Sequence, residues 1–142
     1  MHKILFKAKT VKHRKWVEGS LVVLDEEHMY IVPRHENAST LPVSAIIGYS
    51  AICVDTETVC QYTGLTDKNG KRIYEGDVVL YPWNYQDKTE RFTIKFKDGQ
   101  FVASPIKKTE DYWDFMVGGY SKEMEIIGNI HDNPELLEVH ND

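Results

Sequence analysis

The sequence has few of the features that identify common protein classes. It contains two cysteines, Cys53 and Cys60, and they lack the C-x-x-C spacing of a zinc site or a redox pair. No apolar run approaches the roughly 20 residues of a transmembrane helix. The opening MHKILFKAKTVKHRKW has no unbroken apolar core, unlike a signal peptide. We therefore expect a cytoplasmic protein with reduced thiols and no membrane attachment.

Motifs for phosphate, cofactor and metal sites are also missing. Gly64, Gly70 and Gly76 are too far apart for a dinucleotide-binding fingerprint, and no Gly-Lys-Ser/Thr sequence occurs. The six histidines are scattered mainly in predicted turns and termini, which favours a solvated surface over metal ligation. We therefore predict no catalytic residue, no metal site and no cofactor, and an enzyme is not favoured.

The composition is that of a folded domain, but its charge is unevenly distributed. Apolar residues make up 42% of the 142 residues and charged residues 27%, which argues against disorder. The net charge is −5, yet residues 1–15 hold six basic side chains and no acidic one, and residues 59–142 hold the acidic excess. Non-specific nucleic-acid binders are usually basic throughout, so nucleic acid is not the favoured partner. The candidate nucleic-acid contacts are Lys7, Lys9, Lys12 and Arg14.

Alternation of apolar and polar residues predicts a mainly β protein. Asn69-Gly70 and Asp98-Gly99 are strong hairpin signals, and Asn133-Pro134 predicts a short C-terminal helix at Pro134–Val139. Loops are expected at residues 34–42 and 84–90. The expected strands cover residues 3–11, 15–24, 29–33, 60–66, 71–74, 78–83, 91–97, 100–106 and 125–130.

Residues 43–54, VSAIIGYSAICV, are apolar throughout. They fit a strand pair or one buried strand with a bulge, and we favour strand because of the β-branched content.

Many short strands separated by glycine-containing turns favour a β-sandwich or a small barrel. The net charge changes near Thr56–Val59, which places a boundary between an N-terminal β subdomain, residues 1–57, and a C-terminal one, residues 58–142. Neither subdomain buries much core alone. We therefore expect the two to pack together or to oligomerise, and we predict a homo-oligomer.

Aromatic and acidic side chains supply the remaining candidates for a site. One aromatic cluster comprises Tyr81, Trp83 and Tyr85, and the other comprises Tyr112, Trp113 and Phe115. Such residues capture peptides or stack on bases, although core packing is their default role. Clustered carboxylates bind the divalent metals of nucleases, and the carboxylates considered for that role are Asp77, Asp111 and Asp114. We favour the polar edge of a core strand for Asp111 and Asp114.

The segment Gln61–Val79, QYTGLTDKNGKRIYEGDVV, resembles the signature of the YopX protein family, small proteins encoded by bacteriophages and prophages. EIIGNIHDNPELL is similar to the closing segment of that family, and ILFKAKTVKHRKWVEGSLVV to the start of one subgroup. The resemblance implies a phage origin and a predominantly β protein of two subdomains, the second like an SH3-type barrel. Since the family has no established activity, no catalytic residue is carried over.

Within that segment we expect Asn69-Gly70 to close a type I′ turn and Asp67 to accept hydrogen bonds from turn amides. Gly76 permits a positive φ, and Asp77 braces the turn before the next strand. We favour a scaffold role for this hairpin over a recognition surface. The candidate binding residues on and near it are Gln61, Tyr62, Thr63, Asp67, Asn69, Tyr74, Glu75, Asp77 and Trp83.

Together these observations predict a phage or prophage accessory protein, a non-enzymatic and oligomeric interaction module. It would act on a host or phage macromolecule in the cytoplasm of an infected or lysogenic bacterium. One alternative is a small carboxylate- and metal-dependent hydrolase or nuclease. A second alternative is a nucleic-acid-binding module that uses the basic N-terminus.

Overall fold

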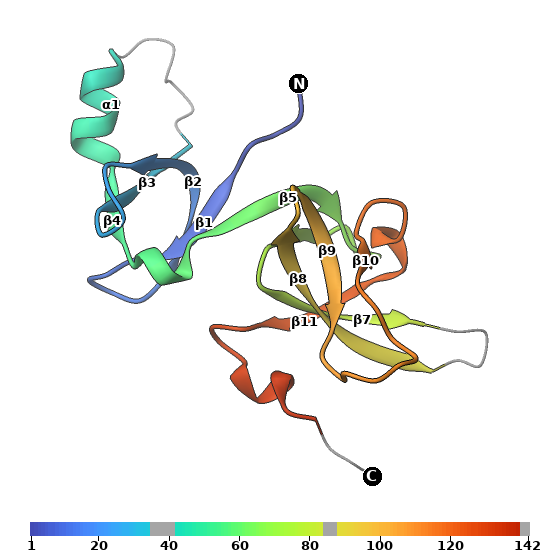
Figure 1. Cartoon of the computed structure of the whole chain (residues 1–142). Helices are drawn as coiled ribbons and strands as arrows, with labels where there is room; N and C mark the ends of the chain where they lie inside the picture. The colour runs from blue at the N-terminus through green and yellow to red at the C-terminus, as the bar shows by residue number, and fades with distance from the viewer. Residues whose placement is uncertain (35–41, 84–87, 140–142) are drawn as a thin grey trace. The chain divides into compact units, whose positions relative to one another are not determined.

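The computed structural model describes residues 1–34, 42–83 and 88–139. This part of the chain is mainly β, as predicted, with two antiparallel sheets and one short α-helix (Figure 1). It divides into two compact units, Met1–Tyr62 (unit 1) and Thr63–Asp142 (unit 2). Among the described residues, no helix has the length and apolar character that crossing a membrane requires. The predicted loops at residues 34–42 and 84–90 lie largely outside the described ranges, and Tyr85 lies wholly outside them. Where the second loop is described its prediction is partly wrong, because Thr89 and Glu90 begin the strand β8 (Thr89–Lys97) and pair with β7 (Asp77–Pro82).

Unit 1 is built on a sheet whose strand order is β4-β3-β2-β1-β5-β6. Its core consists of Ala8, Ile31 and Val54, each at most 2% exposed. Both cysteines are free thiols, Cys53 exposed and Cys60 buried. The strands of this sheet are β1 (Phe6–Lys9), β2 (Trp16–Val23), β3 (Met29–Pro33), β4 (Ile52–Val54), β5 (Cys60–Thr66) and β6 (Arg72–Tyr74). The later residues of β5, and all of β6, belong to unit 2.

The expected strand at residues 43–54 is wrong over most of its length. Val43–Ser50 forms the α-helix α1, and only Ile52–Val54 is a strand. A short apolar run does not by itself distinguish a strand from a helix. The strand preference of β-branched residues reflects packing on a sheet surface, and no residue of α1 is buried. Without sheet packing, that preference does not decide the local structure.

The two hairpin turns differ from each other. Asp98 and Gly99 both have positive φ, 52° and 79°, and join the paired residues Lys97 and Gln100, as a type I′ turn requires. At the other turn Gly70 has a φ of 79° but Asn69 has no positive φ, so the predicted type I′ turn is wrong there. The Gly70 N–H donates instead to the Asp67 carbonyl at 3.0 Å. This bond makes a type I turn followed by a left-handed glycine.

Unit 2 contains a five-stranded sheet of order β10-β9-β8-β7-β11. Strand β11 pairs with β7, so β10 and β11 are the sheet edges and the described strands do not close into a barrel. The 3-10 helix η3 (Ser121–Glu123) precedes β11. The strands of this sheet are β7 (Asp77–Pro82), β8 (Thr89–Lys97), β9 (Gln100–Pro105), β10 (Phe115–Met116) and β11 (Glu125–Asn129). Fully buried core residues include Ile73, Val79, Phe92, Val117 and Met124.

The C-terminal helix is shorter than predicted. Pro134–Leu137 forms the 3-10 helix η4, with Pro134 in its first turn as expected. Asn133 makes no side-chain capping bond to η4, and its Oδ1 accepts from the Asn129 N–H instead, at 3.3 Å. The Asn133 side chain therefore bonds to the end of β11 and does not cap a helix. The 3-10 helix η4 that follows it is a single tight turn.

Candidate functional site

Unit 2 brings the described members of the two aromatic clusters together. Tyr81 and Trp83 stand two residues apart, at and just after the end of β7, and therefore face the same side. Phe115 lies in β10, the edge strand beside β9. We call the set of contacting rings the aromatic row. It consists of Tyr81, Trp83, Phe92, Tyr112, Trp113, Phe115 and Tyr120.

The aromatic row runs from the core to the surface. Trp83 contacts Trp113, with ring centroids 4.8 Å apart, and Phe115, at 5.6 Å. Phe115 also contacts Tyr120, at 5.4 Å with the rings nearly perpendicular, a favourable edge-to-face geometry. Phe92 is fully buried, whereas Trp113 is 61% exposed and Tyr120 45% exposed. The buried rings therefore support outer rings that are accessible to a partner.

Two hydrogen bonds position the segment that precedes β10. The Trp83 Nε1–H donates to the Asp111 carbonyl at 2.9 Å. The Tyr112 hydroxyl donates to Glu90 Oε1, also at 2.9 Å, and this bond raises the pKa of Tyr112 above its usual value. The polar ends of both rings are thereby engaged, which fixes how the segment lies against β7 and β8.

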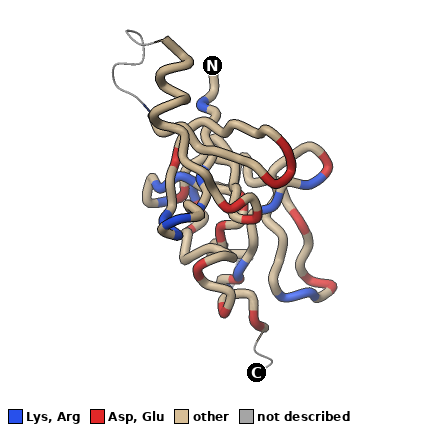
Figure 2. The backbone as a smooth tube through the Cα atoms, turned by 90° about the vertical axis from the view of Figure 1, so that its left-hand side faces the viewer, with Lys and Arg blue, Asp and Glu red and all other residues tan. Residues whose placement is uncertain are grey.

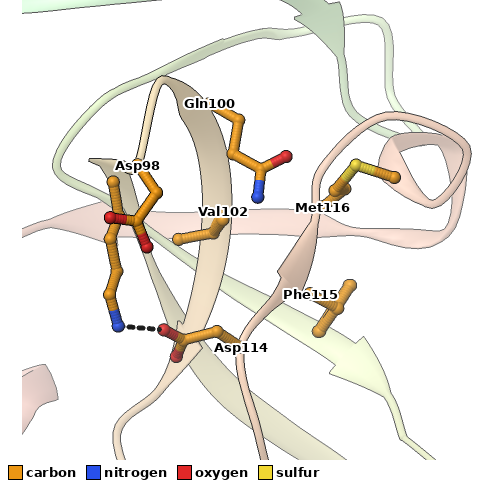
Figure 3. A pocket seen from close by; sticks show the side chains of 7 residues that line it. Asp98, Gln100, Val102, Asp114, Phe115 and Met116 are labelled. Atoms are coloured by element: carbon orange, nitrogen blue, oxygen red, sulfur yellow. Dashed lines mark hydrogen bonds and ion pairs between the residues drawn. The ribbon is translucent and has the colours of Figure 1, made fainter.

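A pocket of about 300 Å³ opens beside the aromatic row. The β8–β9 hairpin forms one wall of the pocket. Asp114, at the end of the segment that precedes β10, forms the other wall together with β10. Figure 3 shows the carboxylates of Asp98 and Asp114 on one side, with Phe115 and Met116 on the other. Phe115 belongs to both the pocket and the aromatic row. The pocket is lined by Lys97, Asp98, Gln100, Val102, Asp114, Phe115 and Met116.

The charged side of the pocket carries two carboxylates and one ammonium group. Lys97 Nζ lies 3.1 Å from Asp114 Oδ2, and this bond raises the pKa of Lys97. Burial raises the pKa of Asp114, but hydrogen bonds from the Ser104 hydroxyl and from Lys97 outweigh burial and hold that pKa below its usual value. Asp98 adds a second carboxylate at the exposed turn. At neutral pH the lining is therefore negatively charged overall.

The carboxylates of the hydrolase hypothesis do not come together. Asp77 is 3% exposed, and its Oδ2 accepts from the Tyr74 N–H at 2.8 Å. Asp114 lines the pocket, which neither Asp77 nor Asp111 reaches. Within residues 1–34, 42–83 and 88–139, no three His, Cys, Asp or Glu side chains are grouped to hold a metal ion. A hydrolase or nuclease built on these three acids has no support in this geometry.

Four of the candidate residues on and near the β5–β6 hairpin serve the scaffold. Asp67, Tyr74 and Asp77 are at most 4% exposed, so little of each side chain is accessible. The Thr63 hydroxyl donates to the Ile73 carbonyl at 2.8 Å. Trp83 is the member of the predicted set that lies in the aromatic row. The remaining candidates are half-buried or exposed, and as binding contacts they stay predictions: Gln61, Tyr62, Asn69 and Glu75.

The basic N-terminal candidates lie in unit 1. Lys7 and Lys9 alternate with the buried Ala8, and their ammonium groups lie 4.7 and 5.5 Å from the Trp16 ring. Arg14 Nη1 lies 2.8 Å from Asp55 Oδ2, and Lys12 is exposed in the β1–β2 turn. Figure 2 shows basic and acidic positions in separate short stretches of the backbone, with neither kind in α1. As nucleic-acid contacts these four basic residues stay a prediction.

The pocket was missed because it is assembled from separate segments. Lys97, Asp98 and Gln100 belong to a hairpin turn, and Met116 to an edge strand that the sequence did not predict. The available signals were the Asp98-Gly99 turn and the aromatic residues near Asp114. Neither indicates that the two segments lie side by side.

Comparisons with known proteins match most of the chain. A family model described as "YopX protein" matches residues 5–138. The "SPbeta prophage-derived uncharacterized protein YopX" of Bacillus subtilis (strain 168) is 34% identical over 70 residues, which are 49% of this chain and 52% of that protein. The match thus spans about half the length of this curated relative.

Two solved structures share the fold. The crystal structure of protein EF1440 from Enterococcus faecalis is 26% identical and covers 97% of this chain and 100% of that chain, with a TM-score of 0.55. The crystal structure of protein yopX from Bacillus subtilis is 19% identical and covers 99% of this chain and 100% of that chain, with a TM-score of 0.56. At that lower identity the likeness concerns the fold alone.

Proposed function

The chain belongs to the YopX protein family, and from this membership we propose that it is a prophage-derived accessory protein that works as a non-enzymatic interaction module. The name of its Bacillus subtilis relative describes a prophage-derived protein, which supports the same origin here. The proposed place of action is the cytoplasm of a lysogenic or infected bacterium. The proposed target is a protein of the host or the phage.

We also propose that unit 2 is an SH3-like fold. The order β10-β9-β8-β7-β11 supports this, because three antiparallel strands are followed by an edge strand, and the last strand returns to the free side of β7. The η3 turn lies just before that return. In this arrangement the outer end of the aromatic row and the pocket both adjoin β10.

The observation that carries the proposed function is the exposed end of the aromatic row. Trp113 and Tyr120 each leave much of a large ring in water, although supporting rings hold them in place. Rigid aromatic anchors of this kind dominate the binding energy of protein interfaces. The pocket that Phe115 shares with the row is lined by two carboxylates, Asp98 and Asp114, and one ammonium group, and its net negative charge would repel a phosphate backbone. The row therefore favours an extended peptide segment over a nucleic acid.

Replacing Trp113 with alanine should weaken peptide binding by about 30-fold, the effect of losing an aromatic anchor worth roughly 2 kcal/mol. A displayed library of random peptides would first be selected on the wild-type protein, and the consensus peptide synthesised with a fluorescent label. Fluorescence anisotropy then gives the affinities of wild type and Trp113→Ala. The matched control is Leu137→Ala, because Leu137 is 40% exposed and lies in η4 of the same unit, outside the aromatic row. Failure to select any consensus, or equal affinities for Trp113→Ala and wild type, would contradict the proposal.

We propose further that the protein self-associates through α1. This helix has no charged residue among its eight and none that is buried. Val43 is 69% exposed, Ile47 41% and Tyr49 93%. A symmetric contact brings the same surface of two copies together. When that surface is uncharged and apolar, the contact produces no like-charge repulsion. A second copy is therefore a suitable partner for this helix.

Ile47→Lys is expected to convert the wild-type oligomer to a monomer, because it introduces two like charges at a symmetric contact. Size-exclusion chromatography with light scattering measures the mass, and circular dichroism verifies that the variant is folded. Val11→Lys is the control, since Val11 is 55% exposed in the β1–β2 turn. A wild-type protein that is monomeric throughout the micromolar range would refute self-association.

A further inference from the structure

We propose that the pocket beside the aromatic row receives the side chain of an arginine or lysine from the bound peptide. This inference rests on the proposed peptide-binding function and names the residue type that the site selects. The occupant is an extended segment of a partner protein, with its apolar part on the aromatic row and its basic residue in the pocket.

The size of the pocket suits one long side chain. Its volume of about 300 Å³ is at the lower end of the range found for small-molecule sites, roughly 300–1,000 Å³. Phe115 lines the pocket and also contacts Trp83 and Tyr120. A chain that crosses the row at Phe115 therefore needs to extend only one side chain to fill the pocket.

The walls of the pocket match the two parts of a basic side chain. Phe115, Met116 and Val102 form the apolar side (Figure 3), and the methylene stem of Lys or Arg packs on such surfaces. A guanidinium or ammonium group is also attracted to the face of an aromatic ring. Across the pocket, Asp98 and Asp114 provide carboxylates that accept hydrogen bonds from the cation.

How a cation would bind depends on which groups already form bonds with the two carboxylates. Asp98 is exposed and forms no hydrogen bond with another described side chain. Asp114 accepts hydrogen bonds from the Ser104 hydroxyl and from Lys97. The Lys97 side chain is 59% exposed, and solvated ion pairs of this kind contribute little energy. An incoming cation can therefore share Asp114 and engage Asp98. The ammonium groups of Lys97 and Lys108, which both act on Asp114, oppose this by like-charge repulsion.

This arrangement predicts effects of opposite sign for neighbouring residues. Asp98→Asn removes an attractive charge, and asparagine tolerates the positive φ of that position, so binding should weaken about fivefold, the upper range for an exposed ion pair. Lys97→Met removes one source of this repulsion and should tighten binding. Damage to the fold would weaken binding in both variants, and an anionic ligand would reverse both signs.

The test uses the peptide selected on the wild-type protein and a copy in which its basic residue is replaced by glutamine. Affinities of both peptides for wild type, Asp98→Asn and Lys97→Met are measured by fluorescence anisotropy and combined in a double-mutant cycle. Glu110→Gln, an exposed acid outside the pocket lining, is the control and should leave affinity unchanged. We expect Asp98→Asn to lower the affinity for the basic peptide and to leave the affinity for the glutamine peptide unchanged.

The outcomes separate this inference from the function on which it rests. A consensus that depends on Trp113 but contains no basic position overturns the inference and leaves the interaction module standing. The inference is also overturned if the basic peptide binds Asp98→Asn and wild type with the same affinity, or if Lys97→Met lowers the affinity for that peptide. If no peptide is enriched at all, both proposals are wrong.

Discussion

Replacing Phe92 with alanine is expected to lower the free energy of unfolding of unit 2 by about 4 kcal/mol, as for other fully buried phenylalanines. Phe92 is 0% exposed at the centre of β8. Its ring centroid lies 5.2 Å from that of Phe115, 5.5 Å from Trp83 and 6.1 Å from Tyr81. Alanine would leave a cavity under the aromatic row, and close-packed neighbours relax only partly into such a space. Urea unfolding followed by tryptophan fluorescence measures the loss.

The same strand supplies a matched control for this prediction. Phe96 stands four residues further along β8 but is 54% exposed, and its ring contacts Phe101 at 5.1 Å. Phe96→Ala should cost less than about 1 kcal/mol, since partly exposed side chains lose little burial. Equal losses for the two variants would show that Phe92 is not at the centre of the core.

Replacing Asp67 with alanine should destabilise unit 2 by about 3 kcal/mol, because three backbone N–H groups would lose an ionised acceptor. Oδ1 accepts from Asn69 and Lys71, both at 2.9 Å, and Oδ2 accepts from Ile126 at 3.0 Å. The carboxylate is 2% exposed, so water cannot easily replace it. It both closes the β5–β6 turn and attaches that turn to β11. Chemical unfolding measures the loss, which Asp111→Asn should not reproduce.

Acid should remove the same stabilisation in the wild-type protein. Burial raises the pKa of Asp67, but the N–H groups of Ile126, Lys71 and Asn69 outweigh burial and hold the pKa below its usual value. A group with a lowered pKa in the folded state stabilises fully above its unfolded value, near pH 4, and the stabilisation is lost as the pH falls through the folded pKa. Asp67→Ala should therefore lose less stability than wild type as the pH is lowered below about 4. Parallel pH profiles for the two proteins would contradict this role.

The strands were predictable because their signals are local. Met29–Pro33 begins and ends where its run of β-prone residues indicated, and Pro33 is its last residue, where a missing N–H costs least. The Asp98-Gly99 turn set the register of β8 and β9, since two residues at positive φ leave one way of pairing Lys97 with Gln100. The helix α1 was not predictable. Its composition is typical of a strand, but none of its residues is buried against a sheet.

The candidate site was predictable in its parts and not in its assembly. Trp83 and Trp113 were both recognised as candidates, but their contact at 4.8 Å joins residues 30 positions apart. The role of Asp67 was likewise half visible. Its bonds to Asn69 and Lys71 follow from turn chemistry, whereas its bond to Ile126 spans 59 residues. No local pattern encodes such a distant partner.

By itself, the sequence determined that this protein is mainly β, where most strands and turns lie, and to which family it is similar. These follow from alternation, from glycines that permit positive φ, and from a long specific motif, all of which are properties of neighbouring residues. Tertiary structure alone decided that 43–50 is a helix, which acids are buried, and that an aromatic row adjoins a pocket containing Asp98 and Asp114. Those features depend on which strands pair and on what then packs against them, and such long-range contacts have no signature in a short segment of sequence.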